Sequence, residues 1–389
     1  MPWAAVTAVL LVLFADRATY RNMDLWTALG ARLDLLPVAL VRVEQGIVGD
    51  RLGLARLAAA GPDERRVMVM GNSRAQDGFF FSPLPRELEL VKVTHAPISP
   101  LEVRLFAPEA AAYEPDVFVV MLSELDTHRP VRIVPRSGFG SLAGVLDLVR
   151  AAGPRFALEN RVKLERLSVA SLLHTYRFRD VLDRAWLDER CSFAPDKRGR
   201  FPGLVSHDLE EAPEPPPAIE GLDALVERFQ ESGRRRVVPS TLNLIHAIRP
   251  GDHAALEQHL IEGALEILRS AGCEVLIVEA PLHPVSYELY DRAATRPEFL
   301  AFVERLRSEL GVHFLPLEES GPFEADDFED PLHLRPARGR ELGALTLERI
   351  EAILGLEFSG EAETPSGGGK RTERKWQKQV EPRRKPGKR

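Results

Sequence analysis

The sequence predicts an α/β protein: a three-layer α/β/α sandwich around a mostly parallel sheet of five strands, with a helical insertion. Short, continuously apolar runs alternate with longer stretches of helical spacing, and strands that are apolar on both faces are typical of parallel sheets covered by helices on both sides. The 389 residues are 44% hydrophobic and 28% charged, which excludes collagen, wholesale disorder and a polytopic membrane protein.

Each predicted strand is a short apolar run. The first, at residues 66–70, stops at Gly71 and leaves no room for a helix before the turn that follows. The other predicted strands lie at residues 88–93, 116–122, 273–279 and 312–317. Helical spacing and stop signals predict helices at residues 100–113, 253–270, 297–310 and 337–354. The alternation indicates βα crossovers, which join parallel strands.

The predicted elements divide the chain into five parts. They are an apolar N-terminal anchor or signal-like segment (1–20), a helical lead-in (21–64), an α/β domain in two pieces (65–126 and 253–356), a helical insertion or cap (127–252) and a tail (357–389). Within the insertion, helices are predicted at residues 142–150, 162–183 and 222–232.

The tail is predicted to be disordered because it has too few apolar residues to bury. Residues 361–389 contain ten Lys or Arg against four Glu, a charge of +6, whereas the remainder of the chain carries −13. A nucleic-acid-binding domain would carry its positive charge on a folded face. No nucleic-acid partner is therefore predicted.

Trp3 to Ala15 contains no charged residue. This run is shorter than the ~20 residues that span a bilayer, so we interpret it as a signal-like segment or as an anchor shortened by a misassigned start codon. The anchor would attach an extracytoplasmic protein, periplasmic or at the cell surface, to the inner membrane. A buried N-terminal helix is the alternative. Two cysteines, Cys191 and Cys273, define neither a disulfide framework nor a zinc site.

Reactive side chains follow the predicted strands at the edge where open α/β sheets bind ligands. Ser73 stands in a Gly-Asn-Ser-Arg turn after the first strand, and Asp330 and His333 precede the last helix. A serine nucleophile needs a base, and the base needs a group that orients it. We therefore predict Ser73 as nucleophile, His333 as general base and Asp330 as its orienting carboxylate.

These motifs resemble those of the SGNH/GDSL hydrolase superfamily, over residues 65–354. Gly71-Asn72-Ser73 is similar to the family's Gly-Asp-Ser block, and the segment from Asp330 to His333 is similar to its Asp-x-x-His block. The middle blocks, which supply further oxyanion donors in the family, are altered around residues 95–97 and 122–126. Candidate oxyanion or substrate contacts are Asn72, Arg74, Ala96, Ser123 and His283, with pairing to an acidic neighbour as the alternative for Arg74.

The resemblance implies a serine-dependent esterase or O-acyltransferase that acts on an acyl ester or a polysaccharide hydroxyl. The apolar N-terminus, the insertion and the altered middle blocks are more similar to the extracytoplasmic proteins of alginate O-acetylation and D-alanyl transfer. Those proteins work beside membrane-bound O-acyltransferases, which makes such an enzyme an expected partner. The alternative is a catalytically inert SGNH-like module that binds a glycan or serves as a scaffold for that partner.

A third interpretation places a metal site at the strand ends. Glu124, Asp126, His128 and His283 are suitable ligand types, but no compact metal-binding motif is present. We therefore predict no metal. Neither a phosphate-binding loop nor a dinucleotide-binding glycine motif occurs in the chain, and no cofactor is predicted.

Overall fold

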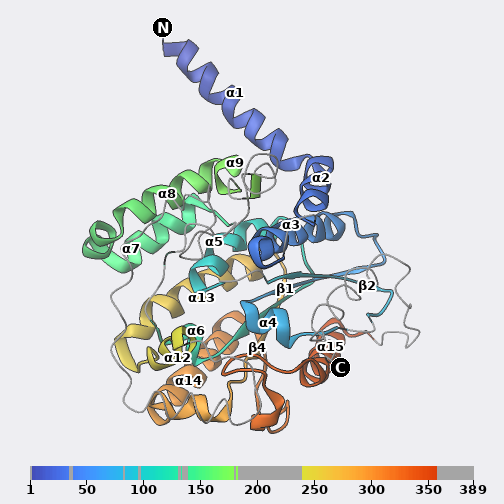
Figure 1. Ribbon diagram of the computed structural model, residues 1–389, viewed down its shortest axis with the longest axis vertical. Coiled ribbons are helices and arrows are strands. Elements are labelled where there is room, and N and C mark those ends of the chain that lie inside the picture. The colour runs from blue at the N-terminus through green and yellow to red at the C-terminus, as the bar shows by residue number, and fades with distance from the viewer. Residues whose placement is uncertain are drawn as a thin grey trace, which may run out of the picture.

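A computed structural model describes residues 2–34, 38–81, 84–94, 98–129, 133, 139–178, 181–182 and 239–356. At its centre is a five-stranded parallel sheet with the strand order β2-β1-β3-β4-β5 (Figure 1). The strands are β1 (Arg65–Met70), β2 (Leu88–Val93), β3 (Val117–Leu122), β4 (Glu274–Glu279) and β5 (His313–Leu315). The predicted α/β fold is confirmed, and each strand lies within or beside the apolar run that predicted it.

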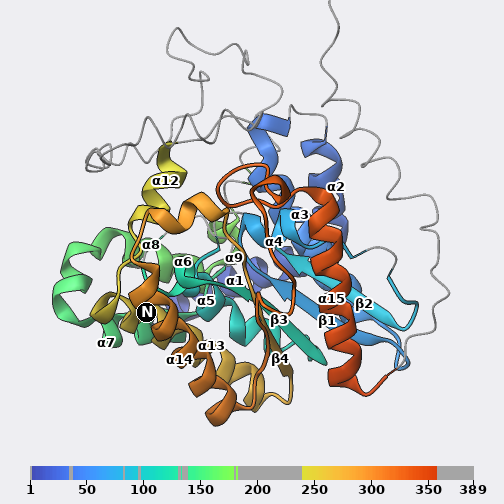
Figure 2. The ribbon, with the colours of Figure 1, turned by 90° about the horizontal axis from the view of Figure 1, so that it is seen from below.

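Helices cover both faces of the sheet (Figure 2). One face packs against α3 (Val38–Ala59), α5 (Pro100–Ala111), α13 (Ala255–Ser270) and α14 (Arg292–Leu310), and the other against α4 (Ser73–Gly78) and α15 (Pro336–Leu354). Successive strand residues point to opposite faces. Accordingly, Phe118 belongs to the first apolar layer and its neighbour Val119 to the second. This double burial explains the continuous apolar runs in the sequence.

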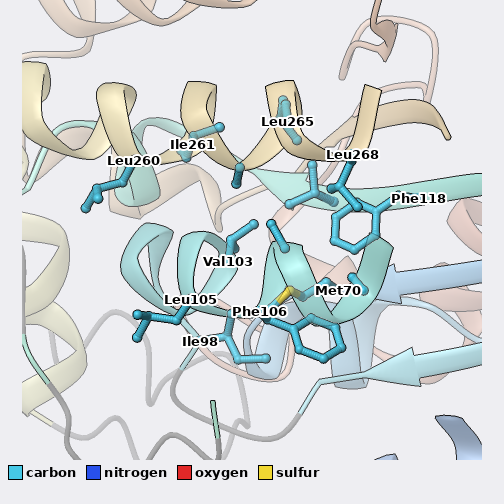
Figure 3. Packing of buried hydrophobic residues seen from close by; sticks show 14 of the residues in the cluster. Met70, Ile98, Val103, Leu105, Phe106, Phe118, Leu260, Ile261, Leu265 and Leu268 are labelled. Carbon is cyan, nitrogen blue, oxygen red and sulfur yellow. The ribbon is translucent and has the colours of Figure 1, made fainter. Parts of the chain in front are cut away.

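The core between the sheet and its first helical layer is filled by α5 and α13 (Figure 3). The packed side chains shown there include Val103, Phe106, Phe118, Leu260, Ile261, Leu265 and Leu268. Ser99 and Glu102 form a reciprocal cap at the start of α5, and Pro100 occupies its first turn. Local capping and long-range packing therefore agree on where α5 begins.

The inserted segment adds α7 (Leu142–Glu159) and α8 (Arg161–Leu172) to the outside of this layer, followed by α9 (His174–Arg177). Its last helix, α12 (Pro239–His246), packs elsewhere: Leu242 and Ile245 belong to a cluster with Leu125 and Leu332. Val145 of α7 and Leu167 of α8 belong to the same core as α5 and α13.

The predicted helix boundaries in the insertion differ from the structure at two places. α7 continues past its predicted end at residue 150 across a kink at Gly153, where φ is 83°. The predicted helix at 162–183 is divided between α8 and α9 at Leu173, whose extended φ and ψ end α8. The predicted helix at 222–232 lies outside the described residues.

The chain begins with α1 (Pro2–Arg21), which projects from the body, and α2 (Met23–Leu33) (Figure 1). Phe14 is 72% exposed and Leu11 is 62% exposed. The alternative of a buried N-terminal helix therefore does not fit these apolar side chains, whereas Asp16, nearer the end of α1, is 4% exposed. Among the helices of the described stretches, none combines the length and the apolar character that a bilayer span needs.

The thiol of Cys273 is buried, and burial raises its pKa to about 12. Cys191 and the tail at 357–389 lie outside the described residues.

The last helix, α15, approaches the segment after α4 very closely. A Cβ atom at Gly343 would lie 2.6 Å from the carbonyl oxygen of Phe80, and one at Gly339 would lie 2.8 Å from the Phe80 ring. The Phe80 amide donates to the Gly339 carbonyl at 3.3 Å. Two glycines one helical turn apart therefore permit this contact, and α15 is the helix that follows the predicted catalytic loop.

We predict that Gly343→Ala lowers the free energy of unfolding by about 1–3 kcal/mol, because the added methyl group overpacks a contact with backbone. Gly49→Ala in α3 is the matched control, since nothing lies within 4 Å of a Cβ atom there. Alanine at that position is expected to be neutral or stabilising by up to about 1 kcal/mol. Denaturant unfolding measures both variants, and equal effects would contradict the close-packing argument.

Candidate active site

Ser73 is placed by a tight turn between β1 and α4. Asn72 caps α4 by accepting a hydrogen bond from the Arg74 amide at 2.9 Å, and Ser73 is the first helical residue. A Cβ atom at Gly71 would lie 2.5 Å from the Cβ of Ala75, so this position requires glycine. As the first residue of a helix, Ser73 has a backbone N–H with no acceptor inside that helix.

The loop at residues 327–335 presents Asp330 and His333. Phe328 and Leu334 form an antiparallel bridge across the loop, and both side chains are buried. The amide of Glu329 donates to the carbonyl of His333 at 2.8 Å. This small hairpin sits directly before α15, so the packing of α15 against α4 fixes the loop relative to Ser73.

The three predicted catalytic residues form one hydrogen-bonded chain. The Oγ of Ser73 lies 2.7 Å from Nε2 of His333. The other ring nitrogen, Nδ1, lies 2.6 Å from Oδ2 of Asp330. The second carboxylate oxygen, Oδ1, accepts hydrogen bonds from the amides of Leu332 at 2.8 Å and His333 at 3.0 Å. The structure thus brings together all three side chains that the sequence proposed as nucleophile, base and orienting group.

The protonation of Asp330 suits this geometry. Burial acts to raise the pKa of Asp330, but the hydrogen bond from His333, the charge of that imidazole and the two backbone amides together hold the pKa below its ordinary value. The carboxylate is therefore ionised at neutral pH and acts only as an acceptor. Nδ1 of His333 must carry the proton, which leaves the lone pair of Nε2 facing the Ser73 hydroxyl.

A buried polar cluster lies beneath the nucleophile turn, formed by Asn72, Arg74, Ser123 and Asp126. Arg74 is 3% exposed; its guanidinium pairs with the Asp126 carboxylate and donates to Oγ of Ser123 at 2.7 Å. The side-chain amide of Asn72 donates to Oδ1 of Asp126 at 3.2 Å. The cluster ties the turn after β1 to α6 (Glu124–Thr127), which follows β3.

Arg74, Ser123 and His283 belong to the framework of the site. Arg74 takes the alternative considered from the sequence, pairing with an acidic neighbour. Ser123 is fully buried. His283 is 3% exposed, its Nδ1 accepts from the Val285 amide at 3.2 Å, and its own amide donates to the carbonyl of Pro331 in the catalytic loop at 3.2 Å. Ala96, the remaining candidate, lies outside the described residues.

Asp126 is the residue whose role the sequence reasoning missed, because it was considered only as a metal ligand. Ser123 and Asp126 cap α6 reciprocally, and a serine followed three residues later by an acidic residue is a signature of a helix start. That signature could have placed the Asp126 carboxylate at a helix N-terminus, where it accepts from the Ser123 amide. It gives no indication that Arg74 is the partner.

The side chains proposed for a metal site have other partners. Asp126 pairs with Arg74, and Glu124 lies 3.8 Å from Arg296. The buried His128 has Nε2 3.3 Å from Glu298, and burial lowers its pKa. In the part of the chain that the structure describes, no three His, Cys, Asp or Glu side chains are grouped as metal ligands. The metal interpretation therefore gains no support.

Two buried carboxyl groups lie near the N-terminal ends of α5 and α13. Glu102 is fully buried, and burial raises its pKa to about 7 even though Ser99 donates hydrogen bonds to it. Glu257 is 2% exposed, and burial raises its pKa to about 8. Both groups hold a proton in the folded protein at pH values where they are ionised in the unfolded chain.

No protein-family model matches this chain, and no curated protein matches it in sequence.

We predict that Arg74→Met lowers the free energy of unfolding by about 3–5 kcal/mol, because Asp126 is left as a buried charge without its counter-ion. The double variant Arg74→Met/Asp126→Asn should lose less than the sum of the two single variants. As a control, Arg56→Met removes an exposed pair with Glu89 and should cost less than about 1 kcal/mol. Additive losses in a denaturant double-mutant cycle would show that Arg74 and Asp126 are not coupled.

We also predict that the titration of Glu257 lowers the free energy of unfolding as the pH rises from about 5 to about 8. Glu257, with a raised pKa in the folded state, contributes stability that is complete below its unfolded pKa and is lost as the pH rises through about 8. Glu257→Gln should flatten this decline, since glutamine imitates the protonated acid. Glu266→Gln, an exposed position on the same helix, is the control. An unchanged slope in Glu257→Gln would refute the assignment.

Proposed function

We propose that this protein is a serine-dependent acyl-transfer enzyme of the SGNH/GDSL type, either an esterase or an O-acyltransferase. The observation that supports the proposal most strongly is the 2.7 Å contact between Ser73 Oγ and His333 Nε2, two residues 260 positions apart in the chain. A hydroxyl, an imidazole and a carboxylate in this order are the groups that nucleophilic acyl transfer requires.

In the first half of the reaction, His333 accepts the Ser73 proton as Oγ attacks the carbonyl carbon of an acyl ester. The imidazolium that forms is stabilised by the Asp330 carboxylate at 2.6 Å, which remains ionised. His333 then gives the proton to the leaving alkoxide as the tetrahedral intermediate collapses. The products of this half are the free alcohol and an acyl group esterified to Ser73.

In the second half, the acceptor is a sugar hydroxyl or water. His333 removes the acceptor's proton, the acceptor oxygen attacks the acyl-enzyme, and the Ser73 oxygen leaves and regains a proton from His333. The same two side chains therefore serve both halves. Whether the enzyme is a transferase or a hydrolase depends on which acceptor reaches the acyl carbon.

The oxyanion that forms in each half needs hydrogen-bond donors. The backbone N–H of Ser73, at the start of α4, is one donor without an intrahelical partner. The altered middle blocks do not keep the other donor residues of the family, and the candidate Ala96 lies outside the described residues.

A second candidate function is a catalytically inert module that binds a glycan or holds a membrane-bound O-acyltransferase. One observation favours it: the polar side chains nearest the nucleophile turn are engaged with one another, since Arg74 donates to Ser123 and Asn72 donates to Asp126. In this function the protein would bind its partner without turning over an ester.

For the enzyme, we infer an extracytoplasmic setting in which α1 attaches the protein to a membrane and the acceptor is a cell-envelope polysaccharide. The exposed apolar side chains of α1 support this setting.

We predict that Ser73→Ala and His333→Ala each lower kcat on p-nitrophenyl acetate by at least about 10³-fold, because the two residues act as one unit. Ser308→Ala is the matched control, since its exposed hydroxyl only bonds the carbonyl of Arg305. Circular dichroism verifies that the variants are folded. If both variants turned over the ester as fast as the wild type, the site assignment would be refuted. If the folded wild type showed no turnover, the inert module would be favoured.

A further inference from the structure

Exposed apolar side chains are concentrated in three helices. Among the described residues, all large hydrophobic side chains that are well exposed lie on α1, α7 or α8, except Leu300. They are Val6, Val9, Leu10, Leu11, Val12 and Phe14 on α1, Leu142, Leu146 and Leu158 on α7, and Val162, Val169 and Leu172 on α8. Scattered single residues of this kind need no explanation, but a concentration on one side of a molecule marks an interaction surface.

The exposed residues of α8 form a stripe that leads to the base of α1. Val162, Val169 and Leu172 recur at helical spacing on the face opposite Leu164 and Leu167, which are buried in the core. Leu158, the last residue but one of α7, precedes them in the chain and is 75% exposed. We refer to Leu158, Val162, Val169 and Leu172 as the α8 stripe.

The α8 stripe ends next to a contact between α9 and α1. The backbone amide of His174 donates to the Asp16 carboxylate at 2.7 Å, and the Nδ1 atom of the same histidine lies 2.9 Å from that carboxylate. The exposed part of α1 begins two residues before Asp16, at Phe14. The apolar surfaces of α8 and α1 are therefore neighbours.

The base of α1 is held firmly to the body. The ring of Tyr20 lies 4.2 Å from the ring of His174 and 5.6 Å from the ring of Phe178, and its hydroxyl bonds the Glu109 carboxylate of α5. The Arg51 guanidinium covers the ring of Tyr20 at 3.9 Å. Figure 1 shows α1 leaving the body beside α8 and α9, with α8 running across the direction of α1. A lipid bilayer that α1 entered would therefore lie against α8 along the length of that helix.

The charge on this side differs from that of the whole chain. Residues 142–172 contain five Arg or Lys against three Asp or Glu, a surplus of two that remains although Arg155 pairs with Glu159 and Arg161 with Glu165. Asp16 is followed by Arg17 and Arg21 after the apolar part of α1. The chain without its tail carries −13. Basic residues beside an exposed apolar helix face are the combination that binds the surface of an anionic bilayer.

We propose that α8 lies on the surface of an anionic lipid bilayer, with the α8 stripe at the boundary between headgroups and acyl chains. The helix α1 inserts beside it, so the body has two attachments and a fixed orientation on the membrane. This inference does not depend on the chemistry at Ser73, and its test needs no catalytic activity.

The test places an environment-sensitive nitrobenzoxadiazole label at Val162→Cys in the full-length chain, with Cys191→Ser to remove the other reactive thiol; Cys273 is buried. Vesicles rich in phosphatidylglycerol should shift the emission to the blue and brighten it at least about twofold, since the label enters the interface. The same label at Leu300→Cys on α14, outside the three helices, should not respond. An unresponsive label at position 162, with the protein bound to the vesicles, would overturn the proposal.

A second measurement compares partitioning of full-length variants into the same vesicles. Val162→Glu/Val169→Glu should lower the partition coefficient by about tenfold, because two apolar contacts are replaced by charges that anionic lipid repels. Leu300→Glu should leave it unchanged, and circular dichroism verifies folding. Equal partitioning of the two variants would overturn the proposal. Sedimentation without vesicles tests the other occupant. If the wild type were a dimer and the double variant a monomer, a second copy of the chain would cover the α8 stripe, and the proposal would be overturned.

Discussion

The close approach of α15 to the segment after α4 is the constraint on which the site depends. Gly339 and Gly343 leave room for Phe80 against the helix, and a methyl group at either position would lie within 3 Å of Phe80 atoms. Because the loop carrying Asp330 and His333 opens into α15, and Ser73 opens α4, this packing decides the distance between imidazole and hydroxyl. Close packing at two glycines of α15 thus determines the geometry of the polar site.

Beneath the site, a buried ion pair stabilises the nucleophile turn. Arg74 follows the nucleophile directly, yet its guanidinium turns inward to Asp126 and joins the turn after β1 to the turn after β3. An isolated buried carboxylate is costly, and pairing with Arg74 offsets much of that cost. The side-chain amide of Asn72 also donates to Asp126. The reacting groups above it are Ser73 and His333, and the buried residues keep the nucleophile turn in place.

The sequence predicted the sheet well because parallel strands that are buried on both faces leave an unmistakable pattern, as at Val117–Leu122. The juxtaposition of Ser73 with Asp330 and His333 was predictable because all three lie beyond the carboxyl ends of parallel strands, which meet at one edge of the sheet. The partner of Arg74 was not, since nothing local connects position 74 with position 126. Likewise, the continuation of α7 past Gly153 depends on packing against α5 and α8, and a glycine followed by a proline ordinarily predicts a helix end. The exposure of the α8 stripe was not predictable either, because tertiary packing decides which face of α8 the core covers.

The central claim is that His333 activates the hydroxyl of Ser73. Reaction with a fluorophosphonate, followed by intact-mass and peptide mass spectrometry, tests it most directly, because only an activated serine displaces fluoride from phosphorus. The account predicts one phosphonyl group per chain, located at Ser73, and its loss in His333→Ala. A folded wild-type protein that stays unlabelled, or labelling at another residue, would contradict it.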